Sequence, residues 1–465
     1  MRVIFLKVII VGAGKLGLRI AESLVFEEVE LTVVDKSPTP LRFLNENYDI
    51  LTVHANGLEL NVLDELSIET YDLLISTTFS DEANVLICSL AKKMGCKQTI
   101  ARIRNPEHLE QMAFIKEEME IDMLINPDAE TANVITKYLT KNLSLYTGDF
   151  AKGEVQLNGF YIGDNQEFVN KKLMDIPALK PVIIASITRG HEILIPHGKT
   201  VLEKSDLIYV MGKKKDIEDL KHKFEEMPSS GKVKSAMILG GGKLGYYLAK
   251  EFVKEKIDTI IIESNIDRCR ELASDFPEAL IIEGDGTDID LLEAENLQNV
   301  DAFIAATGLD EINILMALVA KQHGVNHSIS KISRQNYNRI VDTLDVDASF
   351  NPTHITASNI LKNIRGGRVI SVSLLLGGDA EATELIVSKN SPLINKALKD
   401  LNLPEGLIIG AIISGGKVTV PDGFSILKPN DRVVVFSLNE GLAALKLFLG
   451  SGEGKKGFLE FFKKH

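Results

Sequence analysis

Two glycine-rich stretches decide the fold of this chain. The first is Val8–Gly17, with the sequence VIIVGAGKLG, and it reappears as Ala236–Gly245, with the sequence AMILGGGKLG. In both, an apolar run leads into G-x-G-x-x-G and then into an amphipathic stretch. This order of strand, glycine loop and helix is typical of the dinucleotide-binding turn of a Rossmann domain.

Each part of the first loop has a physical role. Gly12 permits a tight turn, Gly14 lets the backbone approach a pyrophosphate, and Gly17 lets the helix pack closely on the strand. The helix N-terminus offers unpaired N–H groups to phosphates. Asp35 ends the next strand and can accept hydrogen bonds from a ribose diol, and Glu263 corresponds to it in the second copy. A carboxylate there disfavours a 2′-phosphate, so we expect NAD(H) over NADP(H). The alternative is a Rossmann scaffold that binds nothing.

The repeat extends beyond the glycine loops. The motif T-x-x-D-E-x-N at Thr78–Asn84 recurs at Thr307–Asn313, and Asn126-Pro127 recurs as Asn351-Pro352. Further along, Pro196-x-Gly198 recurs as Pro421-x-Gly423. Several spaced positions at a nearly constant offset indicate the order A-B-A′-B′. Turn and linker residues at 227–232 separate the halves.

Strand-like and helical patterns alternate within each A unit. In the first copy we expect strands at 7–11, 31–35, 50–53, 72–77 and 99–102, and helices at 16–26, 81–94 and 128–139. This alternation is typical of βαβ units around a parallel sheet. In the first B unit, 155–161, 182–188 and 207–211 are strand-like.

The predicted fold class is therefore α/β. We expect two doubly wound, Rossmann-like parallel-sheet domains, each followed by a small α+β subdomain. The predicted boundaries are 1–142 and 233–368 for the Rossmann domains, 143–226 and 369–450 for the small subdomains, and 451–465 for a basic and aromatic tail. The tail either contacts a membrane surface or partner or folds back on its own core.

Composition excludes several classes of protein. The 465 residues carry 52 Lys+Arg against 65 Asp+Glu, a formal charge of −13, which argues against bulk nucleic-acid binding. No apolar run approaches the roughly 20 residues that cross a bilayer. The three cysteines show neither metal-ligand spacing nor a disulfide framework. We expect a soluble, cytoplasmic protein without a metal site.

Catalytic motifs are not found. The sequence has no G-x-S-x-G and no H-E-x-x-H. Tyr246 and Lys250 have the spacing of a short-chain reductase pair, but they follow the glycine loop directly, so we interpret them as helix surface. We therefore expect a sensor and not an enzyme, in which ligand binding shifts a conformational equilibrium. The rival hypothesis is an NAD-dependent oxidoreductase with the B units as substrate domains.

Together these motifs carry a resemblance. A Rossmann unit with the first glycine loop, Asp35 and the Thr78–Asn84 motif, followed by Pro196-x-Gly198, resembles an RCK domain (regulator of potassium conductance, also called KTN). Two such units in one chain without pore helices resemble the peripheral regulatory subunits of Trk-type potassium uptake, the TrkA family.

The resemblance implies a regulator on the cytoplasmic face of the membrane. Its partner would be a membrane-embedded potassium transporter or channel subunit, and it would form a homo-oligomer, dimer or tetramer, as an RCK gating ring. An RCK regulator of another cation transporter remains an alternative. The implied cofactor is NAD(H), with ATP and ADP as further candidates. By motif match the binding residues are Gly12, Ala13, Gly14, Lys15, Leu16, Gly17, Asp35, Asn56, Gly57, Thr77, Thr78 and Arg102 in the first copy, and Gly240, Gly241, Gly242, Lys243, Leu244, Gly245, Glu263, Asp285, Gly286, Ala306, Thr307 and Lys331 in the second.

Three features leave the site details open. Lys15 and Lys243 either pair with phosphate or are merely solvated. The first copy has Asn56-Gly57 where the resemblance favours a sequence closer to Asp285-Gly286. Lys331 replaces an arginine and loses its bidentate fork. We therefore expect the second site to bind phosphates differently from the first.

Overall fold

The computed structural model describes residues 6–25, 29–108, 111–141, 148–189, 192–224, 233–334, 337, 341, 344–365, 369–375 and 380–449. The chain divides into two compact units: residues 1–143 with 230–360, and residues 144–229 with 361–465. The first unit holds both Rossmann copies and the second holds both small subdomains. The predicted tail and the linker at 227–232 lie outside the described residues.

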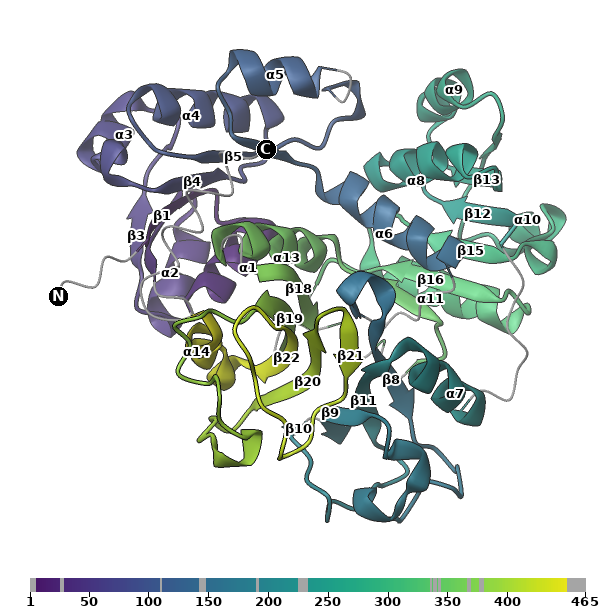
Figure 1. Ribbon diagram of the computed structural model, residues 1–465. Coiled ribbons are helices and arrows are strands. Elements are labelled where there is room, and N and C mark those ends of the chain that lie inside the picture. Colours follow the sequence, from purple (N-terminus) through teal and green to yellow (C-terminus); the bar gives the residue numbers. More distant parts are fainter. Residues whose placement is uncertain are drawn as a thin grey trace. The chain divides into compact units, whose positions relative to one another are not determined.

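The first Rossmann copy is a doubly wound parallel sheet. Within the described residues its strand order is β3-β2-β1-β4-β5-β6. In Figure 1, α3 and α4 cover one face of this sheet and α1 and α2 cover the other. The elements are β1 (Leu6–Val11), α1 (Lys15–Leu24), β2 (Val29–Asp35), α2 (Pro38–Asn47), β3 (Leu51–His54), α3 (Leu60–Glu65), β4 (Leu73–Ser76), α4 (Asp81–Lys93), β5 (Thr99–Arg102), α5 (Met112–Glu118), β6 (Met123–Ile125) and α6 (Pro127–Lys141).

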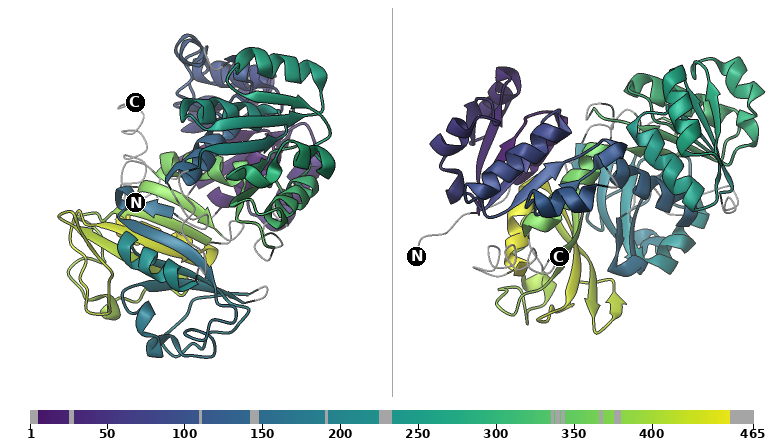
Figure 2. Two further views of the ribbon diagram at one scale, coloured as in Figure 1. Left: turned by 90° about the vertical axis from the view of Figure 1, so that its right-hand side faces the viewer. Right: turned by 90° about the horizontal axis from the view of Figure 1, so that it is seen from above.

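The second copy repeats this plan with the order β14-β13-β12-β15-β16-β17. Both sheets have helices on both faces (Figure 2), as predicted. The short last strands β6 and β17 were not predicted, because three residues give no readable alternation. The elements are β12 (Ser235–Leu239), α8 (Lys243–Lys254), β13 (Asp258–Glu263), α9 (Ile266–Asp275), β14 (Leu280–Glu283), α10 (Ile289–Ala294), β15 (Ala302–Ala305), α11 (Asp310–Gln322), β16 (His327–Lys331), β17 (Ala348–Phe350) and α13 (Pro352–Arg365).

The two Rossmann copies pack against each other through their last helices. Helix α6 of the first copy packs on α8 of the second. There the Asn126 Nδ2 donates to the Tyr247 hydroxyl at 2.7 Å, in a buried position. Nearby, the Thr356 hydroxyl donates to Glu130 of α6 at 2.9 Å. The copies therefore form a pseudo-symmetric pair, in which each contributes its last helix to the contact.

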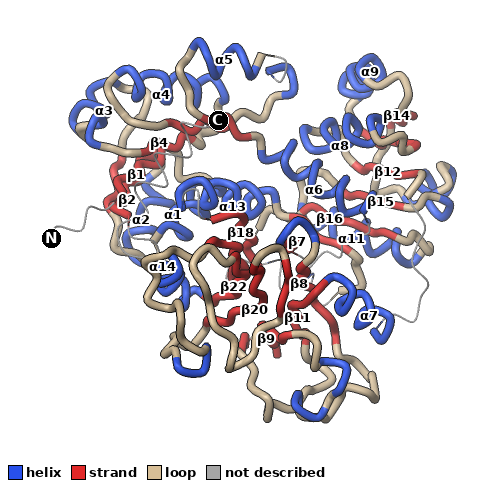
Figure 3. Tube along the Cα trace, in the orientation of Figure 1, coloured by secondary structure: helices blue, strands red, loops and turns tan. Residues whose placement is uncertain are grey.

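The small subdomains are antiparallel sheets with the same strand order, β7-β8-β11-β9-β10 in the first and β18-β19-β22-β20-β21 in the second. Their strands are red in Figure 3. The elements are β7 (Gly148–Phe150), β8 (Val155–Tyr161), β9 (Ile183–Arg189), β10 (Glu192–Leu194), β11 (Leu207–Lys213), α7 (Lys214–Phe224), β18 (Val369–Leu375), β19 (Ala380–Ile386), β20 (Leu407–Ser414), β21 (Lys417–Thr419), β22 (Arg432–Leu438) and α14 (Leu445–Leu449).

The two small subdomains share one hydrophobic core. Leu157, Tyr209 and Met211 of the first pack in the same buried cluster as Val434 and Phe436 of the second. A Cβ on Gly410 would lie 2.0 Å from the Met211 sulfur, so a larger residue there would force the Met211 side chain to move. Sequence patterns indicated each subdomain but not this pairing, because alternation shows that a face is buried and not what buries it.

Among the described residues, no helix combines the length and apolar character needed to cross a membrane.

Candidate nucleotide-binding site

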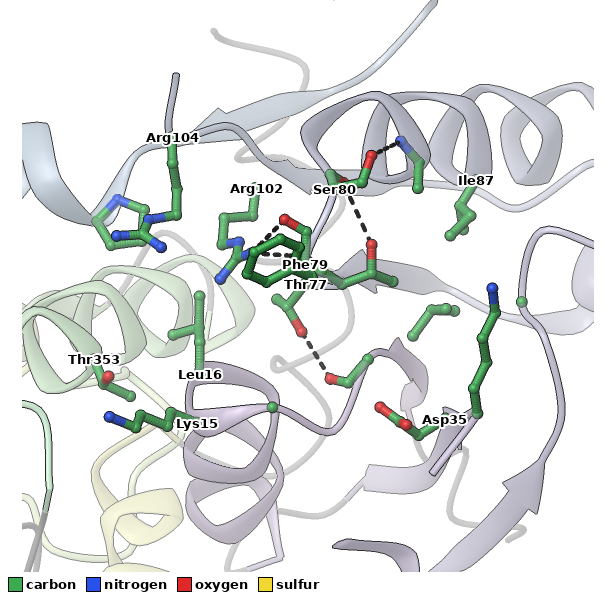
Figure 4. A pocket seen from close by; sticks show the side chains of 18 of the residues that line it. Lys15, Leu16, Asp35, Thr77, Phe79, Ser80, Ile87, Arg102, Arg104 and Thr353 are labelled. Carbon is green, nitrogen blue, oxygen red and sulfur yellow. Dashed lines mark hydrogen bonds between the residues drawn. The ribbon is translucent and has the colours of Figure 1, made fainter. Parts of the chain in front are cut away.

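A cavity of about 870 Å³ opens where the first sheet's strands end. Ligands of doubly wound sheets bind at this carboxyl edge. The cavity is lined by Val11, Gly12, Gly14, Lys15, Leu16, Val34, Asp35, Lys36, Ala55, Asn56, Gly57, Leu58, Thr77, Thr78, Phe79, Ser80, Ala83, Ile87, Arg102, Arg104, Pro127, Asp128, Gly308, Lys331, Ser333, Pro352 and Thr353. Figure 4 shows part of this lining.

The glycine loop has the geometry that its sequence predicts. Gly12 has φ +103°, and a Cβ there would lie 2.7 Å from the Thr78 nitrogen. A Cβ on Gly17 would lie 1.9 Å from the Gly12 carbonyl oxygen, so helix and strand could not pack this closely. Gly14, by contrast, has no atom within 4 Å of such a Cβ. Its surroundings are open on the side where a ligand backbone would approach.

At the start of α1, no side chain of the helix itself occupies the N–H groups that an anion would use. Gly14 caps the helix without a side-chain hydrogen bond, and the first turn holds no acidic residue. The N–H groups there are therefore available to phosphate. Lys15 begins the helix, is exposed and lines the cavity.

Asp35 is held in place by two backbone groups. Its Oδ2 accepts from Ala13 N at 2.5 Å and its Oδ1 from Ser37 N at 2.7 Å. Glu263 repeats this with Gly241 N at 2.8 Å and Asn265 N at 2.9 Å. Each Asp35 oxygen keeps a further lone pair, because carboxylates have about four acceptor sites, whereas the Glu263 Oε1 also accepts from the Ser264 hydroxyl. The acid thus orders the loop and can still receive a ribose diol.

The repeated T-x-x-D-E-x-N motif ties neighbouring loops together. The fully buried Asn84 accepts from Thr78 N at 2.8 Å and donates to the Arg102 carbonyl at 2.9 Å. Asn313 makes the same bonds to Thr307 and Lys331. Asp81 accepts from the backbone N–H groups of Arg104 and Asn105, both at 2.8 Å. Asn84 and Asp81 therefore fix the backbone of the loops that border the cavity, and do so without lining it themselves.

Arg102 brings a positively charged side chain to the cavity. One of its terminal nitrogens donates to the Thr78 carbonyl at 2.5 Å, while its Nε is buried and has no hydrogen-bond partner among the described residues. Burial, with the neighbouring Arg104, lowers the pKa of Arg102. Arg104 instead forms an ion pair with Asp128 at 2.7 Å. A buried donor without an acceptor is costly, so this arrangement fits an anionic ligand.

The second Rossmann copy completes the wall of this first cavity. Lys331, Ser333 and Thr353 all line it. Lys331 donates to the Thr307 carbonyl at 2.7 Å, and burial lowers its pKa. The motif match places Lys331 in the second pocket, whereas the structure also brings it to the first.

The second glycine loop differs from the first in one side chain that sequence reasoning missed. The Arg268 Nε donates to the Gly241 carbonyl at 2.8 Å, and its guanidinium lies over the Tyr246 ring at 5.5 Å. Gly240 has φ +100°, and a Cβ on Gly245 would lie 2.0 Å from the Gly240 oxygen. The loop backbone is thus conserved between copies, while its surroundings are not.

Most residues predicted for the first site are brought together. Of that set, only Ala13 and Gly17 do not line the cavity, since Ala13 acts through its N–H and Gly17 through close packing. Sequence reasoning missed the exposed Phe79, the pair Arg104 and Asp128, and Thr353. The first three follow strand ends, a position that could have signalled them. Thr353 also follows a strand end, at the repeat position of Asp128, but its strand β17 belongs to the other copy, so the sequence does not assign it to this cavity.

Residues 8–127 and 236–352 match the TrkA-N domain, and residues 159–225 and 382–450 match the TrkA-C domain. The chain belongs to the TrkA family. The Trk system potassium uptake protein TrkA homolog 1 of Methanosarcina mazei is 31% identical over 441 residues, covering 93% of this chain and 97% of that one. The TrkA of Azorhizobium caulinodans is 30% identical over 448 residues, covering 94% and 97%.

Solved structures share the fold of this chain. The GsuK channel bound to NAD aligns with a TM-score of 0.53 and 16% identity, covering 100% of this chain and 80% of that one. The GsuK RCK domain has the same TM-score and identity, with 96% of that chain covered. The RCK fold expected from the sequence is thereby confirmed for this TrkA family member.

Proposed function

We propose that this chain is a nucleotide-sensing regulatory subunit of a Trk-type potassium uptake system. The single observation that carries the nucleotide role is the first cavity, with its open glycine loop and the buried Arg102 Nε, for which the described part of the chain offers no hydrogen-bond acceptor. The potassium role is supported by the relatives, which are named Trk system potassium uptake proteins and match over almost their full length.

The described residues fit NAD(H) in defined parts of the cavity. Asp35 would receive the adenosine ribose, Asn56 and Gly57 would border the adenine, and the N–H groups at Gly14 and Lys15 would face the pyrophosphate. Arg102 and Thr78 would lie beyond them. ATP or ADP would use the same adenosine and phosphate contacts. The second set, from Gly240 to Gly245 with Glu263, Asp285, Gly286, Ala306, Thr307 and Lys331, would form a second site. When bound, the nucleotide supplies binding energy that shifts a conformational equilibrium.

The repeat suggests how the signal is transmitted. Four modules, at 1–142, 143–226, 233–368 and 369–450, would form two RCK units that assemble with other copies into a ring. Nucleotide binding would change the angle between modules and so act on a membrane-embedded potassium-transporting partner. We place the ring on the cytoplasmic face of the membrane, and the tail at 451–465 is a candidate for the membrane contact.

Calorimetry tests the binding step directly. NAD, NADH, ATP and ADP are titrated into the full chain and into Asp35→Ala and Glu263→Ala. Loss of one binding event in each variant is expected. Binding that both variants leave unchanged would contradict the assigned sites.

Potassium flux tests the regulatory step. The chain is added to liposomes that contain the membrane protein co-purified with it, and flux is followed with and without nucleotide. A nucleotide-dependent change is expected. A wild-type chain that instead oxidises NADH with added small-molecule substrates would support the oxidoreductase hypothesis.

A further inference from the structure

The two Rossmann copies meet in two places with unequal chemistry: α6 packs on α8, and α13 lies beside α1 (Figure 1), where the charge of Arg19 reaches His354. In the α6–α8 half, Tyr247 and Asn126 satisfy each other at 2.7 Å. By the internal repeat, Arg19 of α1 corresponds to Tyr247, and Asn351 corresponds to Asn126. His354 of α13 corresponds to Ala129. A neutral, hydrogen-bonded pair in one half is thus replaced by a cation, an amide and an imidazole in the other.

Three buried polar atoms in the α1–α13 half have no hydrogen-bond partner among the described residues. They are the Arg19 Nε, the Asn351 Nδ2 and the His354 Nε2. The side chains of Arg19 and His354 are only 8% and 9% exposed. Unpaired buried polar groups are costly, so these three atoms make the α1–α13 half less stable than full pairing would make it.

His354 is the titratable group among these atoms. Burial and the nearby Arg19 charge lower its pKa to about 3. Arg19 forms an ion pair with Glu22 of the same helix at 3.2 Å. Both charges also influence the pKa of Tyr48, the residue after α2, which is raised mainly by burial. Lys15 begins α1, and Glu130 of α6 bonds Thr356 on the same helix as His354. Of these groups, Arg19 is the one whose charge acts on His354, and together with burial it opposes a second positive charge there.

The first turn of α13 connects this cluster to the nucleotide cavity. Pro352 and Thr353 line the cavity, and His354 is the next residue. Figure 4 shows Thr353 and Lys15 among the lining side chains. Separation of α13 from α1 would therefore open the cavity wall as well as expose His354.

We propose that the α1–α13 contact is a proton-sensitive latch, in which protonation of His354 opposite Arg19 releases α13 and weakens nucleotide binding in the first cavity. The effect on nucleotide binding rests on the proposed function, whereas the release of α13 on protonation of His354 does not. The sign follows from linkage: the closed form binds His354's proton less tightly than an exposed histidine does, with its pKa near 6.5. Closure is therefore favoured above about pH 6.5 and loses about tenfold in its equilibrium constant for each pH unit below it.

Amide hydrogen exchange on the full chain measures the latch without nucleotide. Peptides from residues 352–360 report on α13, and peptides from 266–275 of α9, which does not line the cavity, are the internal reference for intrinsic exchange rates. Between pH 7.5 and 5.5, protection of 352–360 relative to 266–275 is expected to fall about tenfold. Over the same range the Kd for NADH rises by at most that factor.

Two variants and one control make the test specific. His354→Ala copies Ala129 of the other half, and His354→Gln keeps a neutral polar side chain; either one should abolish the pH response. The control is His323→Ala. His323 lies at the end of α11, where it bonds Glu293, and its removal should leave the pH response intact. Relative protection that does not change with pH, or a response that survives in both His354 variants, overturns the latch. Absence of NADH binding at pH 7.5 overturns the proposed function instead, while the exchange comparison still decides the latch.

Discussion

The Asp35 carboxylate accepts the backbone N–H of Ala13 at 2.5 Å, so the end of β2 holds the glycine loop that follows β1. The same carboxylate is the group that would bind a ribose. Loop order and ligand binding are therefore joined in one side chain, and substitutions at this position affect both.

Replacing Asp35 with Ala should weaken folding and binding together. Two charge-assisted hydrogen bonds to backbone are lost, at about 1–3 kcal/mol in total for a half-buried group. We expect a lower melting temperature and NADH affinity at the first site reduced by more than about tenfold. Thermal unfolding and calorimetry measure the two effects. Glu263→Ala is the matched control, because it should leave binding at the first site in place.

Two glycines of the first loop should respond differently to alanine. A Cβ at Gly17 meets the Gly12 carbonyl oxygen at 1.9 Å, so Gly17→Ala should lower the free energy of unfolding by about 1–3 kcal/mol. Gly14→Ala meets no atom within 4 Å and should leave stability almost unchanged while weakening NADH binding. Denaturant unfolding with parallel titrations separates them. Equal stability losses in the two variants would contradict this geometry.

The buried Asn84 should be a stability residue and not a ligand contact. Its Oδ1 accepts from Ser76, Thr78 N and the Thr78 hydroxyl. Asn84→Ala leaves these donors and the Arg102 carbonyl without their partner, at an expected cost of about 2–4 kcal/mol. Chemical denaturation measures it. Glu82→Ala, at an exposed position of the same motif, removes a first-turn carboxylate that accepts from the Ser80 hydroxyl, and should cost less than Asn84→Ala, about 1 kcal/mol at most.

Tyr247→Phe should loosen the α6–α8 half of the contact. The lost bond to Asn126 leaves a buried amide unpaired, at about 1–3 kcal/mol. Burial raises the pKa of Tyr247 above its usual range. The wild-type contribution is therefore fully present below the unfolded-state value near pH 10 and is lost as the pH rises further. The free energy of unfolding of the wild type and of Tyr247→Phe is measured at pH 8 and at pH 11. The difference between the two proteins should shrink at pH 11, and a larger difference there would contradict the prediction.

Two equivalent leucines test the proposed oligomer. Leu86 of α4 is 50% exposed and Leu315 of α11 is 57% exposed, at matching positions of the two copies. Exposed apolar groups repeated in this way fit contacts between copies of the chain. The double variant Leu86→Asp, Leu315→Asp should reduce the mass seen by light scattering. Met174→Asp, on an equally exposed residue of a small subdomain, should not; an unchanged mass for the double variant would place the contact elsewhere.

Local patterns predicted the regular elements well. Strand β8 was predicted with its observed ends, and the helix expected at 81–94 is α4 at Asp81–Lys93. Alternation and glycine loops encode these elements because their hydrogen bonds join residues close in sequence. The β6 and β17 strands were not predicted, since their pairing depends on a sheet edge built by distant residues.

The sequence by itself determined the repeat, the two Rossmann folds and the core of the first candidate site, from Gly12 through Asp35 to Arg102. Only the tertiary structure decided that Lys331 and Thr353 join that site, that Arg268 covers the second loop, and that His354 is buried near Arg19. The physical reason is the distance along the chain between the residues that interact. A glycine loop and its acidic partner are linked by hydrogen bonds within one βαβ unit, whereas the contacts of His354 and Lys331 arise from the packing of one copy on the other.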